Sequence, residues 1–187
     1  GFIQGFGTAC LYSNAGLKGL LVFADAMSQV MHPKDKNALM FGDAAVAMTV
    51  EPSGSMCRFH SVSDGGRFGL VTKEKEWLYM DGNGVFTFAM NDVFKMIEPI
   101  DEGFDYYVLH QSNYFILKHI ARKLKLRPEQ LVSNIDRYGN TSAVSIPLAL
   151  ATEKPTGDIF ACGYGAGLNW GIGMFYYEPE NIYYKEE

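Results

Sequence analysis

Two polar residues in the second half of this sequence have types and positions that suit chemistry. His110 ends a predicted buried strand in the string LHQSN, and Asn140 lies in YGNTSA, where a tight turn leads into a helix. Many α/β folds place functional groups at the carboxyl ends of their strands. Both side chains can donate a hydrogen bond while uncharged, which suits the stabilisation of a developing negative charge. The alternatives are a structural histidine and a helix N-cap.

A third segment, GYGAG from Gly163 to Gly167, lies between two predicted strands. The backbone N–H groups of such a loop can point into a cavity and stabilise an oxyanion, and one such donor contributes about 3 kcal/mol. An ordinary glycine-rich turn is the alternative. No GK[ST] follows the glycines, which excludes a phosphate loop of that type, and the sequence has no GxSxG string typical of serine hydrolases.

Alternating helices and strands must position these segments. The first part of the chain predicts a helix over 1–15, a buried strand over 19–24, a strand pair over 38–51 interrupted at Gly42 and Asp43, and sheet continuing over 56–62. The remainder predicts helices over 84–97, 113–126 and 142–151, a helical start at 128–130, and strands over 106–110, 158–163 and 168–177. This alternation predicts a layered α/β fold.

The length and composition limit the class of protein. With 187 residues, the chain is one domain or half of a larger duplicated fold, and its 48% hydrophobic residues exclude disordered and collagen-like classes. The net charge of −5 excludes a whole-surface attraction to nucleic acid or anionic lipid. No apolar stretch approaches the roughly 20 residues of a membrane span, and no signal peptide is recognisable. We therefore expect a soluble, cytoplasmic protein.

The three cysteines, Cys10, Cys57 and Cys162, form no CxxC pair, and none has a histidine at metal-ligand spacing. We therefore expect neither a disulfide scaffold nor a zinc site. All three are interpreted as core residues, because free cysteine is among the most buried residue types.

Four strings resemble a known family. FGDAAVAM, HQSNYFILKHIARKLKL, NIDRYGNTSAVSIPLAL and GYGAGLNWGIGMF, in this order, closely resemble the C-terminal part of the 3-oxoacyl-acyl carrier protein synthase III family, over residues 1 to about 176. The resemblance implies a homodimer with the thiolase-like αβαβα fold, here incomplete. Residues 1–52 would end the first of two duplicated halves, 53–177 would form the second, and 178–187 would be a surface tail.

The resemblance also implies an activity. In that family a Cys-His-Asn set catalyses a decarboxylating Claisen condensation between an acyl-coenzyme A primer and malonyl-acyl carrier protein, without a cofactor. His110 and Asn140 match the histidine and asparagine, and the backbone at Gly165 and Ala166 matches the oxyanion donors. Gly1 begins a string that matches the end of the family's Cys-small-Gly-Phe motif, so the nucleophilic cysteine would lie two residues before it. Cys162 is the alternative nucleophile within this sequence.

Several positions match substrate-binding residues of the family. Asn113 matches a contact to the pantetheine arm, and Lys36 stands where an arginine commonly contacts the coenzyme. Phe41, Met80 and Phe86 match positions near the acyl pocket, although a core role also explains apolar residues there.

The carrier protein is expected to dock on the helix after His110. This helix carries Lys118, Arg122, Lys123 and Lys125, of which Arg122 and Lys123 match the carrier-binding pair. A solvated basic face is the alternative. The sequence departs from the family pattern at four further positions: Phe115 and Thr87 replace basic docking residues, and Ala44 and Val46 replace glycines.

Two other functions remain open. Some relatives transfer an acyl group to a small-molecule hydroxyl or amine, using the same cysteine without decarboxylation. A non-catalytic subunit that binds the carrier or supports dimerisation is a different class of function.

Overall fold

The computed structural model describes residues 1–52, 57–100, 103–180 and 182. Its helices are α1 (Phe2–Asn14), α2 (Gly82–Phe88), α3 (Phe94–Ile97), α4 (Tyr114–Lys123), α5 (Ile135–Tyr138) and α6 (Ser145–Glu153). Its strands are β1 (Gly19–Asp25), β2 (Ala44–Val50), β3 (Arg58–Ser63), β4 (Val71–Glu74), β5 (Trp77–Met80), β6 (Tyr106–Leu109), β7 (Leu131–Val132), β8 (Gly157–Gly165) and β9 (Asn169–Tyr177). A π-helical turn joins α2 to α3, so the predicted helix over 84–97 is continuous.

A five-stranded sheet with the order β3-β9-β8-β6-β7 forms the centre of the molecule. β6 runs parallel to β7 and β8, whereas β9 is antiparallel to β8 and β3. Along β8, Ile159 and Ala161 join one buried apolar cluster, while Phe160 and Cys162 join another. Because successive side chains of a strand point to opposite faces, both faces of this sheet are covered.

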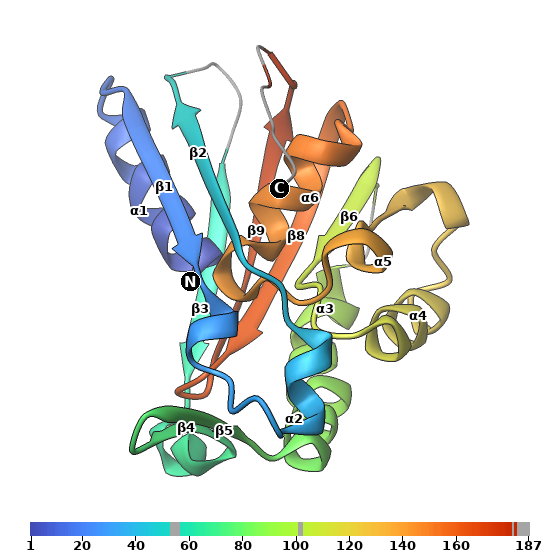
Figure 1. The fold of residues 1–187 in the computed structure, drawn as a ribbon. Coiled ribbons are helices and arrows are strands. Elements are labelled where there is room, and N and C mark those ends of the chain that lie inside the picture. Colours follow the sequence, from blue (N-terminus) through green and yellow to red (C-terminus); the bar gives the residue numbers. More distant parts are fainter. Residues whose placement is uncertain (53–56, 101–102, 181, 183–187) are drawn as a thin grey trace.

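Helices cover the two faces of the sheet. α1 and α6 pack on one face, and the continuous helix α2–α3 and α4 pack on the other. The antiparallel hairpin β1–β2 lies on the far side of α1 and α6 (Figure 1). α1 carries no charged residue, and α6 carries only its last one, Glu153, as expected for helices buried on most sides. The described residues thus form four layers of the expected αβαβα arrangement.

The chain uses one supersecondary unit twice. α1, β1 and β2 follow one another as a helix and an antiparallel strand pair, and α6, β8 and β9 do the same. In both units the helix lies in the layer between the two sheets. This repetition agrees with the duplicated fold that the resemblance implies.

Four predicted elements differ from the structure. The strand over 19–24 is not fully buried, because Leu20 and Val22 are exposed on its outer face. The strand pair predicted over 38–51 is only one strand, since residues 36–40 form a 3₁₀ turn that the Asp35 side chain caps through Asn37 N. The glycine segment is not a loop throughout, because β8 continues to Gly165. Finally, part of the predicted strand over 56–62 lies outside the described residues, and β3 covers 58–63.

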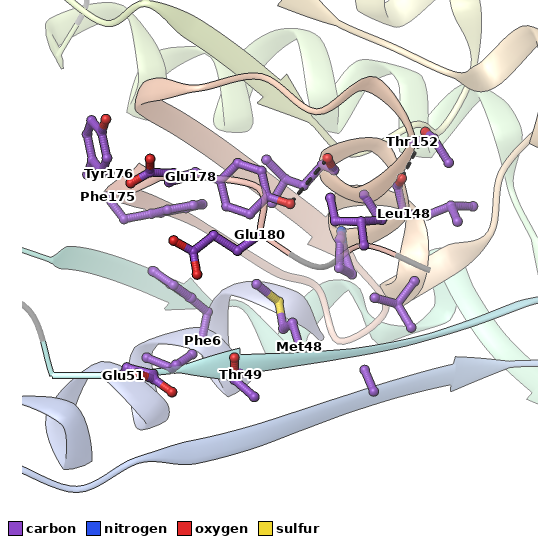
Figure 2. A pocket seen from close by; sticks show the side chains of 18 of the residues that line it. Phe6, Met48, Thr49, Glu51, Leu148, Thr152, Phe175, Tyr176, Glu178 and Glu180 are labelled. Carbon is purple, nitrogen blue, oxygen red and sulfur yellow. Dashed lines mark hydrogen bonds between the residues drawn. The ribbon is translucent and has the colours of Figure 1, made fainter. Parts of the chain in front are cut away.

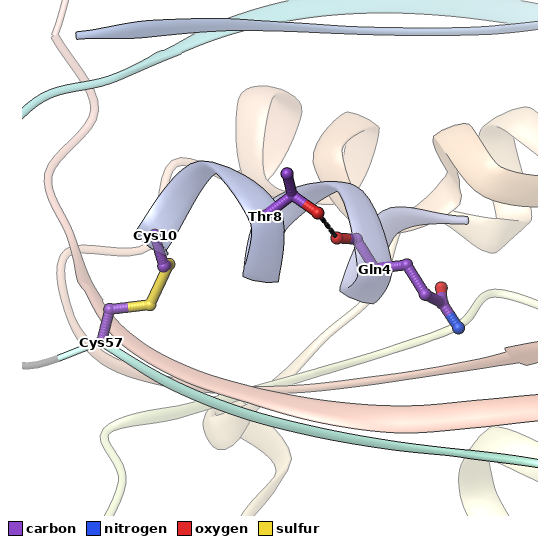
Figure 3. The surroundings of a disulfide bond; sticks show 4 residues. All are labelled: Gln4, Thr8, Cys10 and Cys57. Carbon is purple, nitrogen blue, oxygen red and sulfur yellow. Dashed lines mark hydrogen bonds between the residues drawn. A yellow bond between two sulfur atoms is a disulfide. The ribbon is translucent and has the colours of Figure 1, made fainter. Parts of the chain in front are cut away.

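The expectation that the cysteines form no disulfide is wrong, although Cys10 is buried in the core as expected. Cys10 of α1 and Cys57, just before β3, form a disulfide with Cα atoms 6.3 Å apart (Figure 3). α1 packs along β3, which brings together residues separated by 47 positions. This proximity arises from helix-on-sheet packing, so the cysteine spacing does not predict it. Cys162 is free and buried as expected.

Candidate active site

The structure brings the predicted reactive groups to one cavity. His110, Asn140, Gly165 and Ala166 all line a cavity of about 620 Å³. Gly1 and the first turn of α1 line it too. In the described part of the chain, no helix is long and apolar enough to cross a membrane, and no three His, Cys, Asp or Glu side chains gather as metal ligands.

The backbone that carries His110 is fixed on both sides. The His110 N–H donates to Cys162 O of β8 at 2.8 Å, which continues the parallel ladder one residue beyond β6. The next residue, Gln111, is fully buried, and its amide group donates to Leu109 O at 2.6 Å and accepts from the Ser133 hydroxyl at 2.8 Å. These bonds hold the end of β6 against the segment after β7.

The His110 ring has two neighbours that fix its orientation. Its Nδ1 lies 2.7 Å from Ser145 Oγ at the start of α6. The Tyr164 ring packs against it nearly edge-on, at a centroid distance of 5.0 Å and an interplanar angle of 87°. Burial lowers the pKa of His110 to about 4, because desolvation disfavours the charged imidazolium. The ring is therefore neutral at pH 7.

Two glycines allow the turn that carries Asn140 to approach the segment before β2. Gly139 has a φ of +63°, and a Cβ there would lie 2.7 Å from Met40 O. A Cβ at Gly42 would meet Tyr138 O even more closely. This close approach allows the Asn140 N–H to donate to Met40 O at 2.7 Å and the Gly42 N–H to donate to Asn140 O at 3.1 Å.

Asn140 is buried, and a local hydrogen bond orients its side chain. Its relative exposure is 7%, and its Oδ1 accepts from Ser142 N at 2.9 Å. This bond forms an Asx-turn, and Asn140 is not the helix N-cap of the alternative prediction, because Thr141 is the N-cap of the 3₁₀ turn that follows. Because it uses the amide oxygen, the Nδ2 group remains as the donor on a side chain that lines the cavity.

The glycine segment enters the cavity at the end of β8. Gly163, Tyr164, Gly165 and Ala166 line it. The Asn169 side chain fixes the turn that follows, because its Nδ2 donates to Ala166 O at 2.6 Å and its Oδ1 accepts from Ser63 of β3. The carboxylate of Asp25, another lining residue, accepts from Ala143 N at 2.9 Å and connects β1 to the turn before α6.

The predicted binding residues are divided between the cavity and its surroundings. Phe41, Met80 and Asn113 line the cavity, and Asn113 Oδ1 also caps α4 by accepting from Ile116 N at 2.8 Å. Phe86 lies outside the lining and packs against Phe115, at a centroid distance of 5.8 Å. Lys36 is exposed on the 3₁₀ turn before β2 and does not line the cavity.

Three of the predicted docking residues lie on the exposed side of α4, and Lys125 lies just beyond its end. Lys118, Arg122, Lys123 and Lys125 are all exposed. The Lys118 and Lys123 ammonium groups lie 4.4 Å from the ring centroids of Tyr114 and Phe94, respectively. These contacts orient the two stems and leave the charges at the surface.

None of the cysteines in this chain suits a nucleophile. Cys10 and Cys57 are joined to each other. Cys162 is 1% exposed, and burial raises the pKa of its thiol to about 12. Because the thiolate is the nucleophilic form, Cys162 is inert at neutral pH. We therefore do not assign the nucleophile to Cys162.

A larger hollow of about 1590 Å³ lies elsewhere, between β2, the C-terminal half of α6 and the end of β9. Figure 2 shows Met48, Thr49 and Glu51 on one side of it, and Leu148 and Phe175 on the other. None of the predicted site residues lines it. We therefore assign the chemistry to the smaller cavity, where the hydrogen-bond donors converge.

Reasoning from the sequence missed three residues of the site. Ser145, Tyr164 and Asn169 contact or fix the predicted residues from α6, β8 and β9. All three lie inside the strings that carry the family resemblance. Their contacts depend on the packing of α6 and β8 against the end of β6, and no spacing along the sequence indicates that packing.

Comparisons with known proteins show the family that this chain resembles. A family model described as 3-oxoacyl-[acyl-carrier-protein (ACP)] synthase III matches residues 1–65, and one described as the C terminal of that synthase matches residues 101–177. The beta-ketoacyl-[acyl-carrier-protein] synthase III of Lactococcus lactis is 32% identical over 209 aligned positions, which cover 93% of this chain and 64% of the relative.

Solved structures show the same similarity. The 3-oxoacyl-(acyl carrier protein) synthase III of Pseudomonas aeruginosa superposes with a TM-score of 0.86 at 31% identity, over 96% of this chain and 64% of the other. The corresponding enzyme of Thermus thermophilus superposes with a TM-score of 0.84 at 32% identity, over 96% of this chain and 66% of the other. The chain thus spans about 64% of the length of the Lactococcus and Pseudomonas proteins, with the thiolase-like fold that they share.

Proposed function

Because the chain belongs to the 3-oxoacyl-[acyl-carrier-protein] synthase III family, we propose that it carries the decarboxylation site of a condensing enzyme. The enzyme would join an acyl group from an acyl-coenzyme A primer to malonyl-acyl carrier protein, with 3-oxoacyl-acyl carrier protein as the product. The convergence of His110 and Asn140 on one cavity carries this proposal.

The decarboxylation step needs donors rather than a base. When malonyl thioester loses carbon dioxide, the electron pair of the broken carbon–carbon bond moves into an enolate, whose oxygen becomes negative. Two uncharged donors, the His110 ring and the Asn140 amide, would stabilise that oxygen in the cavity that both residues line. The carbanionic carbon then attacks the acyl-enzyme carbonyl, a new carbon–carbon bond forms, and the cysteine thiolate leaves.

The nucleophile in this proposal is the cysteine that the family pattern puts two residues before Gly1. Gly1 and the first turn of α1 line the cavity, so a side chain just before them would reach the same space. The positive end of the α1 dipole favours a thiolate at that position. The backbone N–H groups at Gly165 and Ala166 would hold the thioester oxygen during acyl transfer.

The remaining predicted residues would bind substrate and carrier. Phe41 and Met80 line the apolar part of the cavity and would contact the acyl chain. Asn113, at the α4 end of the cavity, would contact the pantetheine arm. Phe86 and Lys36 lie further out, where Phe86 would act through its packing on α4 and Lys36 through the coenzyme phosphates.

We propose that the exposed basic residues of α4, Lys118, Arg122 and Lys123, dock the acidic carrier. α4 begins at Tyr114, directly after Asn113 of the cavity lining, so a carrier bound there would lie close to the site that its arm must enter. We also propose that the enzyme works as a homodimer in the cytoplasm.

Isotope release from malonyl-carrier tests the proposed function. In the full-length protein, His110→Ala or Asn140→Ala should lower the release of labelled carbon dioxide by about 100-fold or more, since each removes one enolate donor. Acyl transfer from acyl-coenzyme A to the enzyme should persist in both variants. Thr49→Ala, which removes an exposed hydroxyl on the outer face of β2, is the control and should decarboxylate at the wild-type rate.

Wild-type decarboxylation in either donor variant would exclude the proposed roles. Acyl transfer to a small hydroxyl or amine without malonyl-carrier would instead support the acyltransferase alternative.

A further inference from the structure

A hydrogen bond between His110 and Ser145 links the candidate donor to the central helix α6. His110 Nδ1 and Ser145 Oγ are 2.7 Å apart, and Ser145 is 1% exposed. We propose that Ser145 is a positioning residue that keeps His110 in the tautomer with its proton on Nε2, the nitrogen left to face the ligand. This inference rests on the proposed function, since it names the group that sets the direction of one enolate donor.

The surroundings of the Ser145 hydroxyl favour donation from its Oγ to His110 Nδ1. The Gln111 N–H donates to Ser145 Oγ at 3.4 Å. The hydroxyl therefore accepts from the backbone on one side, and its single proton is free for His110 Nδ1 on the other. If Nδ1 accepts that proton, it carries none of its own, and the neutral ring must carry its proton on Nε2.

The geometry of β6 and α6 makes this arrangement rigid. His110 follows β6 directly and is tied to Cys162 O, whereas Ser145 opens α6 after the turn that the Asp25 carboxylate holds through Ala143 N. The Tyr164 ring closes the third side of the imidazole. A rotation of the His110 ring would break the Ser145 bond and the edge-on contact together.

The tautomer decides whether His110 can donate a hydrogen bond to the enolate oxygen. A ring with its proton on Nε2 presents a donor to the forming enolate oxygen. The other neutral tautomer presents a lone pair, which repels that oxygen. Burial already keeps the ring uncharged, so burial alone does not distinguish the two neutral forms. The Ser145 hydroxyl is the contact that does.

Nitrogen-15 spectra of labelled histidine test the tautomer directly in the full-length protein. The His110 signals are identified by their loss in His110→Gln. In the wild type we expect an unprotonated Nδ1 and a protonated Nε2. Ser145→Ala should give an averaged signal that reports both tautomers, and Ser145→Thr, which keeps the hydroxyl, should restore the wild-type pattern. A protonated Nδ1 in the wild type would overturn the proposal.

Kinetics separate a positioning role from a purely structural one. Ser145→Ala should lower kcat for decarboxylation by roughly tenfold, as expected when an orienting group is lost, with little change in KM for malonyl-carrier. Ser145→Thr should recover most of that loss. Thr49→Ala, on the outer face of β2, should leave both constants unchanged. Equal kcat in Ser145→Ala and the wild type would overturn the proposal. The proposal would also fail if Ser145→Thr does not recover the activity that Ser145→Ala loses, provided that an unfolding measurement shows Ser145→Thr to be folded.

The two kinds of failure are distinguishable. If His110→Ala retains decarboxylation, the proposed function fails, whatever the spectra show. If His110→Ala abolishes decarboxylation but Ser145→Ala leaves the tautomer unchanged, only the role of Ser145 fails.

Discussion

His110 is a partly buried, neutral imidazole in the folded protein, and desolvation of its charged form makes the fold less stable in acid. Its pKa is about 4 in the folded state against about 6.5 in an unfolded chain. Between these values the unfolded chain binds one more proton than the folded protein. The free energy of unfolding therefore falls as the pH falls from about 6.5 towards 4, and above 6.5 the residue imposes no such cost.

Urea unfolding at two pH values measures this effect. Between pH 7 and pH 5 the contribution of His110 should lower the free energy of unfolding by up to about 2 kcal/mol, less where cavity water screens the charge. His110→Gln, a neutral side chain of similar reach, should lose that part of the pH dependence. The same dependence in both proteins would show that His110 titrates normally in the fold.

The sequence predicted which two residues would share a cavity, but not the contacts that surround them. The position of His110 after a predicted strand and the family strings indicated His110 and Asn140, and the structure places both in one cavity. Tyr164 was recognised only as part of a glycine-rich segment. Its ring packs on His110 because β8 lies beside β6, and this neighbour relation depends on strand order.

The elements around Asn140 depend on close backbone approach. The turn at Gly139 and the segment from Met40 to Gly42 exchange hydrogen bonds, although they come from different supersecondary units. The sequence predicted a strand pair over 38–51, because small and apolar residues there fit a pleated strand. The 3₁₀ turn forms instead because Asp35 caps it, and the short bridge between Phe41 and Asn140 is all that remains of the first strand.

Gly139→Ala tests how strictly this approach positions Asn140. An alanine at φ +63° is strained, and its Cβ would meet Met40 O at 2.7 Å. The variant should lose about 1–3 kcal/mol of stability, and in the full-length protein it should lose decarboxylation by more than it loses acyl-enzyme formation. Both rates can be measured on one preparation.

Gly65→Ala is the matched control, because a Cβ there meets nothing within 4 Å. If Gly139→Ala behaves like Gly65→Ala in both stability and activity, the close approach does not position Asn140.

At the scale of the whole molecule, the layers follow from which faces are apolar. The central sheet is apolar on both faces and is covered on both. The alternation of helices and strands predicted this layered α/β class, whereas the cavity arises only where α1, β6, α6 and β8 meet. The division of the chain near residue 52 into two duplicated halves stays a prediction.

The outer face of the β1–β2 hairpin is uncharged and exposed. The residues of this face alternate along each strand with residues that point inward, and those of β1 pair directly with those of β2. They are Leu20, Val22, Ala24, Ala45, Ala47 and Thr49. Leu20 and Val22 are 67% and 65% exposed. Contiguous apolar faces of this kind promote association and bind hydrophobic dyes.

Replacing Leu20 and Val22 together by lysine should therefore change the behaviour of the 187-residue chain without changing its fold. We expect weaker binding of the dye ANS and less concentration-dependent association in sedimentation, because two charges interrupt the apolar face. Far-ultraviolet circular dichroism should be unchanged, since both side chains point away from the core. Leu39→Lys is the control, because Leu39 is 93% exposed on the 3₁₀ turn, outside the hairpin. An equal loss of dye binding in Leu39→Lys would show that the hairpin face is not the apolar surface that governs association.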